Sequence, residues 1–105
     1  MSNSTKLRLI FTEKDIRRIS LKKMQTNNLV ITIDVHGMKC YEAKRFINNL
    51  VNLLLQTDFQ LTIIHGYRHG ASIKDMLATD YDNNRVYKQH IDPNNQGVTH
   101  MYIAA

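Results

Sequence analysis

The sequence predicts one α/β domain folded as a two-layer sandwich, in the order β-α-β-α-β-β, with both helices on one face of a mixed four-stranded sheet. Its length of 105 residues suits a single hydrophobic core. Several short runs alternate apolar and polar residues, which is the period of strands with one buried face. Two longer runs repeat apolar residues at helical spacing and follow the first two strand-like runs.

The first predicted strand covers residues 29–36, because Ile31, Ile33 and Val35 alternate there with polar side chains. A helix over about residues 40–56 follows, with a single apolar stripe along it. This alternation is typical of a sheet covered by helices on one face only, since strands covered on both faces are almost continuously apolar.

The remaining strands and the second helix are predicted from the same two patterns, which are apolar–polar alternation for a strand and apolar residues at helical spacing for a helix. Residues 60–65 form a strand, 71–81 a helix, 85–91 a strand, 92–97 a long turn and 98–104 a last strand. Strands joined through a helix run parallel, so the carboxyl ends of the first two strands share one edge of the sheet. Ligands of open α/β sheets gather at that edge.

The net charge of +5 lies entirely in the amino-terminal segment. Residues 1–28 carry seven basic and two acidic side chains, whereas residues 29–105 carry seven of each sign. Thr12 precedes Asp15 as a helix cap, and the spacing predicts a basic helix over about residues 12–24. We therefore divide the chain into a basic amino-terminal extension, 1–28, and an α/β domain, 29–105, and expect an anionic partner such as nucleic acid.

Cysteine content and hydropathy predict a cytoplasmic protein. Cys40 is the only thiol, so no disulfide can form within the chain. No run of residues is long and apolar enough to span a membrane, and the first residues do not lead into a signal-peptide core. Four methionines are expected to fill the core: Met24, Met38, Met76 and Met101.

Asp34 and His36 lie two residues apart on the first strand, so their side chains are expected to point the same way just before Gly37. A carboxylate beside an imidazole orients it, and such a pair can act as a general base or bind a metal. The ordinary interpretation is an aspartate that accepts loop hydrogen bonds and a histidine at the surface.

A loop rich in glycine and histidine follows the second strand: His65, Gly66, Tyr67, Arg68, His69 and Gly70. Glycine allows a backbone to approach a ligand, arginine can bind a phosphate through two hydrogen bonds, and tyrosine can stack on a base. A tight turn that carries polar side chains at the surface would explain the glycines, but it would not explain why histidine, arginine and tyrosine gather there. The loop therefore favours an anion-binding site.

Two motifs in this order resemble those of the Smr (small MutS-related) domain family over about residues 30–104. The first is Ile33-Asp34-Val35-His36-Gly37, followed by Glu42 and Ala43 at the start of a helix. The second is the loop at 65–70, and Gly97-Val98-Thr99 is similar to the family's final strand. The resemblance implies a β-α-β-α-β-β two-layer fold, nucleic-acid binding and endonuclease activity on DNA or RNA.

The residue roles implied by this resemblance fall on both motifs. Asp34 and His36 correspond to residues implicated in cleavage, and His65, Gly66 and Gly70 belong to the loop that contacts the substrate. The sequence departs from the family at Arg68, which replaces a glycine, and at Lys39, which replaces a capping threonine at a cost of about 1 kcal/mol unless another group caps the helix.

The leading hypothesis is a nucleic-acid-binding protein that cleaves phosphodiester bonds. His36 is the expected general base, Asp34 its orienting group or a metal ligand, and His65 with His69 the donors or acid toward the phosphate. A divalent metal such as Mg²⁺ stays open, because few ligands are present. The side chains and turns expected to bind nucleic acid are Lys39, Gly66, Tyr67, Arg68, His69, Gly70, Arg17, Arg18, Lys22 and Lys23.

Two other functions fit the same sequence. The first is a non-catalytic adaptor that holds DNA or RNA on the same loops. The second is a protein-interaction module, in which Leu7 to Met24 form an arm that docks onto a partner or a second copy.

Overall fold

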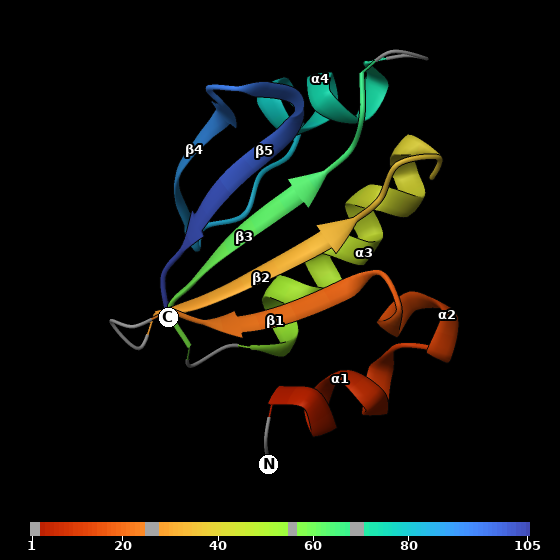
Figure 1. The fold of residues 1–105 in the computed structure, drawn as a ribbon, viewed down its shortest axis with the longest axis vertical. Coiled ribbons are helices and arrows are strands. Elements are labelled where there is room, and N and C mark those ends of the chain that lie inside the picture. The colour runs from red at the N-terminus through yellow and green to blue at the C-terminus, as the bar shows by residue number, and fades with distance from the viewer. Residues whose placement is uncertain (1–2, 25–27, 55–56, 68–70) are drawn as a thin grey trace.

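The computed structural model describes residues 3–24, 28–54, 57–67 and 71–105, and it is an α/β fold built on a five-stranded mixed sheet (Figure 1). The strands are ordered β1-β2-β3-β5-β4 across the sheet. Their bounds are β1 Ile19–Lys23, β2 Leu29–Asp34, β3 Phe59–Ile64, β4 Val86–Asp92 and β5 Asn95–Ile103. Only β2 and β3 are parallel, and the other neighbouring pairs are antiparallel.

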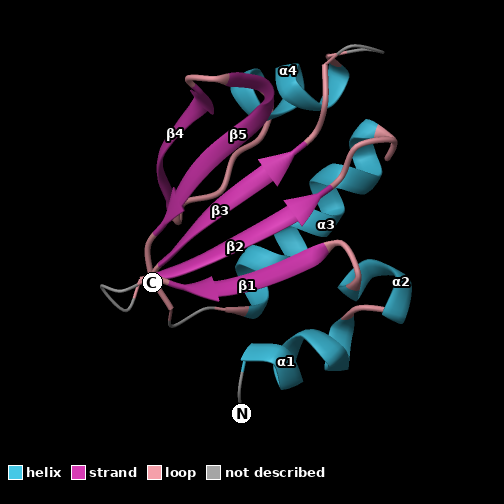
Figure 2. Cartoon of the chain, in the orientation of Figure 1, coloured by secondary structure: helices cyan, strands magenta, loops and turns pink. Residues whose placement is uncertain are grey.

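Four helices complete the described chain: α1 Asn3–Ile10, α2 Glu13–Ile16, α3 Cys40–Leu53 and α4 Ser72–Thr79. Helices α3 and α4 lie on the same face of the sheet (Figure 2). Burial in β2 and β3 alternates residue by residue, so one sheet face is sealed by the helices and the other is open. None of the described helices is long and apolar enough to cross a membrane.

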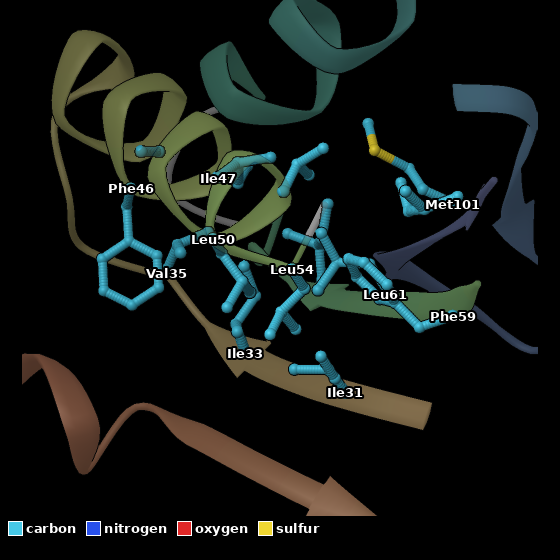
Figure 3. Close-up of a cluster of buried hydrophobic side chains, with 14 of the residues drawn as sticks. Ile31, Ile33, Val35, Phe46, Ile47, Leu50, Leu54, Phe59, Leu61 and Met101 are labelled. Carbon is cyan, nitrogen blue, oxygen red and sulfur yellow. The ribbon is translucent and has the colours of Figure 1, made fainter. Parts of the chain in front are cut away.

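The core lies between α3 and the covered face of the sheet. Side chains from the strands, such as Ile31, Ile33 and Leu61, meet Ile47 and Leu50 of α3 and are fully buried (Figure 3). Met76 and Met101 are also buried, as expected. Met24 is 48% exposed, however, so its prediction as a core residue is wrong. Met38 is half-buried and packs at the edge of the core.

The predicted helix over residues 12–24 is wrong beyond its first turn. Thr12 does cap α2, because its hydroxyl accepts a hydrogen bond from the backbone N–H of Asp15 at 3.2 Å. The helix ends at Ile16, and β1 then pairs with the edge of β2, which makes the sheet five-stranded rather than four-stranded. Ile19 and Leu21 alternate with polar residues, so this segment also has the period of a strand, and the free edge of β2 supplies its hydrogen bonds.

The amino-terminal segment packs on the chain's own core. Leu7 of α1 and Phe11 after it are buried, and the Phe11 ring lies 5.0 Å from that of Phe46 in α3, measured between centroids. The segment that the protein-interaction alternative treats as an arm thus contacts the helix layer of the same chain. Leu9 and Ile10 point away from this contact and are exposed.

The predicted long turn at residues 92–97 is also shorter in the structure. A two-residue turn, Pro93 and Asn94, joins β4 to β5, and β5 begins at Asn95. The pairing of β4 with β5 is irregular between Ile91 and Asp92, so residues 96–98 have no regular partner on β4. This irregularity leaves the Gly97 carbonyl available for the site.

Candidate functional site

The first half of the site is the turn that follows β2. Val35 is fully buried, and its N–H donates to the Ile64 carbonyl at 2.9 Å, which holds the end of β2 against β3. Gly37 has a φ of 81°, a left-handed conformation that glycine adopts without strain, and there the chain turns toward α3. The polar residues on either side of Val35 are thereby held at the carboxyl edge of the sheet.

Asp34 and His36 form a close pair in this turn. The Asp34 Oδ1 atom lies 2.5 Å from His36 Nδ1 and also accepts the His36 backbone N–H at 3.1 Å. Because a carboxylate only accepts, Nδ1 carries the proton and the lone pair of a neutral ring is on Nε2. The two side chains are 68% and 41% exposed for His36 and Asp34, so this oriented imidazole is open to solvent.

The second half is the turn that follows β3. The backbone N–H groups of His65 and Gly66 both donate to the Gly97 carbonyl, at 2.8 and 3.0 Å. Gly66 has a φ of 73°. A Cβ atom on Gly97 would lie 3.2 Å from the Gly66 Cα, so the β5 backbone approaches this turn more closely than a side chain would allow. The β4–β5 hairpin therefore fixes the turn after β3.

The two turns converge on one cavity. A Cβ on Gly66 would lie 3.8 Å from the His36 Cβ, and the cavity between them has a volume of about 590 Å³. Tyr67, which is 43% exposed, contributes its ring to the wall. The start of α4 and the β4–β5 hairpin complete the lining, so four separate segments of the fold meet at the expected edge of the sheet.

His65 has a structural position that corrects its expected role as a donor or acid toward a phosphate. It is 5% exposed, Nδ1 donates to the Gly66 carbonyl at 2.8 Å, and Nε2 lies 2.8 Å from the Thr99 hydroxyl. Burial lowers the pKa of His65, which favours the neutral ring. Both nitrogens are used within the protein, so His65 positions the Gly66 turn.

Arg18 lies beside the Asp34–His36 pair. Its backbone carbonyl accepts the Asp34 N–H at 2.9 Å, and its guanidinium Nη1 donates to the Asp34 carbonyl at 2.9 Å. This arginine was expected on a basic helix, where its distance from Asp34 could not be inferred. The pairing of β1 with β2 instead brings a positive charge to the end of β2, where it can attract a phosphate.

The other basic residues predicted to bind nucleic acid lie at the end of α2, on β1 and just before α3. Arg17 ends α2 and is exposed, Lys22 is exposed on β1, and Lys39 is exposed just before α3. Lys23 belongs to β1. The helix start at Lys39 is capped by another group, as its backbone N–H donates to the Glu42 carboxylate at 3.1 Å.

Three of the predicted loop residues, Arg68, His69 and Gly70, lie outside the described residues. Within the described ranges, no three His, Cys, Asp or Glu side chains gather closely enough to hold a metal ion. Among the described residues, His36 and His65 line the cavity, and Asp34 contacts His36.

Sequence reasoning missed several residues that line the cavity, among them Met38, Ser72 and Asn95. The side-chain oxygen of Asn95 accepts the Gly97 N–H at 2.9 Å, which shapes the hairpin under the Gly66 turn. An Asn two residues before a glycine is a turn signal that could have indicated this role. Nothing in the local sequence indicated that the hairpin would reach the cavity.

No family model, no curated protein and no solved structure matches this chain.

Proposed function

We propose that this chain is a Smr-like nucleic-acid-binding protein that cleaves phosphodiester bonds, with His36 as the general base. The observation that carries the proposal is the Asp34–His36 pair, in which the carboxylate holds Nδ1 of an imidazole that is 68% exposed and lines the cavity. A general base needs a fixed orientation and access to the attacking oxygen, and this pair has both.

The reaction needs one proton acceptor and one source of positive charge. His36 Nε2 takes the proton from the attacking hydroxyl or water, a new P–O bond forms, and the bond to the leaving oxygen breaks. The Arg18 guanidinium beside Asp34 offsets the negative charge on the phosphate. The leaving oxygen takes its proton from solvent in this scheme, because His65 is buried with both ring nitrogens bonded and His69 lies outside the described residues.

The test is a cleavage assay on branched, nicked and single-stranded DNA and on structured RNA, each with and without a chelator. We expect His36→Ala and Asp34→Asn to lower the cleavage rate by about 10²- to 10⁴-fold, as is typical for loss of general base catalysis. Asp80→Asn is the matched control, since Asp80 is an exposed carboxylate that pairs with Lys44 away from the cavity.

The outcomes separate cleavage from binding alone. If both site variants cleave like the wild type, the proposed catalytic role is wrong. If no substrate is cleaved but oligonucleotides bind, the chain is the non-catalytic adaptor, which would use the same cavity. Unfolding curves for each variant show whether a lost rate reflects lost structure.

A further inference from the structure

A second group of aromatic side chains lies on the open face of the sheet, across β4 and β5. We call Tyr87, His90 and Tyr102 the aromatic patch. The His90 ring stacks on Tyr102 with centroids 5.7 Å apart and an interplanar angle of 22°, and the Tyr87 ring lies 6.3 Å from Tyr102. The Lys88 ammonium sits over the Tyr102 ring at 5.6 Å. Three rings and one cation are therefore assembled side by side.

The strand register explains this assembly. Lys88 is paired with Tyr102 and His90 with His100, so these side chains project on one face. The register shifts between Val86 and Lys88, which turns Tyr87 outward at the edge of the sheet and leaves it 69% exposed.

The polar side chains next to the patch are fixed by one hydrogen-bond network. The His100 ring lies between Asp92, at 2.7 Å from Nε2, and Thr62, at 3.0 Å from Nδ1, with Gln60 also 3.3 Å from Nδ1. The bond to His100 lowers the pKa of Asp92, so the acidic group on this face is already paired. Lys88 thus supplies the charge beside the exposed rings.

A second cavity adjoins the patch. It has a volume of about 480 Å³, and Tyr87, Tyr102 and Gln60 form part of its lining. Asp58 lies on another part of that lining, so an anionic backbone is expected on the Lys88 side. A ring-lined recess with one adjacent cation matches a flat aromatic ligand that carries a phosphate.

We propose that the aromatic patch is a stacking surface for the bases of a single-stranded nucleic acid. The inference rests on the proposed function and names its substrate class. By the strand register Tyr102 aligns with Gln60 and Val30, so it lies two strand spacings across and four residues along the sheet from Asp34, a separation of about 16 Å. A strand of a few nucleotides spans that distance. A duplex hides the faces of its bases and cannot stack on the rings.

The test uses the absence of tryptophan from the sequence. Tyr87→Trp places a single indole in the patch, and Tyr41→Trp places one at an exposed position on α3 as the matched control, since Tyr41 is 63% exposed. A short single-stranded oligonucleotide, as DNA and as RNA, is titrated against each variant. The duplex formed from the same sequence is titrated in parallel.

We expect the single strand to quench the indole of the Tyr87→Trp variant at saturation and to leave the Tyr41→Trp variant unchanged, with a weaker effect of the duplex. Replacing both Tyr87 and His90 with alanine should weaken single-strand binding by about tenfold or more. The inference is overturned if the single strand does not bind, if it binds without quenching, or if both indoles respond equally. The readout is binding alone, so cleavage by Asp34→Asn at the wild-type rate would overturn the proposed catalysis and leave this inference intact, and the two proposals fail separately.

Discussion

At the scale of single residues, His65 is a buried side chain whose ionisation is coupled to folding. Its pKa is lowered from the ordinary value of 6.5 mainly by burial and also by the positive charge of Lys74, while the hydrogen bond to the Gly66 carbonyl opposes this shift. A protonated ring is therefore more favourable in the unfolded chain than in the folded one. The stabilisation is fully present above the unfolded value and is lost as pH falls through the lower folded value.

We predict that the protein becomes less stable as the pH falls and that part of this loss depends on His65. We expect the free energy of unfolding of the wild type to fall more steeply between neutral pH and about pH 5 than that of His65→Gln, which cannot titrate. Urea unfolding at a series of pH values measures the difference. Asp92, whose pKa is lowered below the ordinary 3.8, titrates outside this range. Parallel curves for the two proteins would contradict the buried neutral ring.

The side of a strand on which a residue lies could be predicted where the alternation of apolar and polar residues was clear. Asp34 and His36 were expected on the same side of the chain, and the structure places them in contact. The same rule shows why His65 differs: it continues the buried series of Leu61 and Ile63, a signal that the loop motif obscured. The location of Arg18 depended on a pairing with Asp34 that no local pattern contained.

At the scale of elements, Arg85 joins the end of α3 to the sheet. Its guanidinium donates to the carbonyls of Val51, Leu54 and Thr57, the last two at 2.7 and 2.9 Å, and its Nε donates to Ala104 at 2.7 Å. The last carbonyls of a helix have no partners within the helix, so a group from outside must satisfy them. One arginine thus caps α3 and holds the end of β5.

Arg85→Lys tests this role while keeping the charge. A single ammonium cannot reach carbonyls on both sides, so we expect the free energy of unfolding to fall by about 2 kcal/mol or more. Arg45→Lys, on the exposed side of α3, is the control and should change stability by less than about 0.5 kcal/mol. Equal effects of the two substitutions in urea unfolding would show that the bonds of Arg85 do not stabilise the fold.

Segments whose apolar residues fit only the helix spacing or only the strand spacing were predicted well. Segments that fit both spacings were not. The strands near residues 29–36 and 60–65 and the helix from residue 40 appear within a few residues of their expected bounds. In the segment from Ile16 to Leu21, Ile16 and Ile19 fit a helix, whereas Ile19 and Leu21 fit a strand. The decision came from the unpaired edge of β2, a contact distant in sequence.

At the scale of the whole molecule, the amino-terminal charge belongs to the folded domain. Strand β1 lies at the sheet edge beside β2, and Leu7 and Phe11 contribute to the core. Deletion of residues 1–28 would remove β1 and these two core side chains, and it would unfold part of the protein. Neutralisation of exposed cations is therefore the proper test of their role.

Binding of an oligonucleotide should depend on salt through these cations. We expect Arg17→Gln with Lys22→Gln to lower the slope of log affinity against log salt, by about 0.7 for each residue that contacts a phosphate of a single strand. Arg45→Gln on α3 is the control, and its slope should match that of the wild type. Fluorescence anisotropy across a salt series measures the slopes. Identical slopes for all three proteins would contradict a phosphate contact at this edge.

The orientation of His36 is the feature on which the proposed chemistry depends. Nitrogen-15 NMR of the histidine rings at alkaline pH measures the tautomer directly. We expect the His36 proton on Nδ1 in the wild type, because Asp34 accepts it, and a shift of the population toward Nε2–H in Asp34→Asn. A wild-type ring with its proton on Nε2, or a tautomer ratio that Asp34→Asn leaves unchanged, would contradict an imidazole held by this carboxylate.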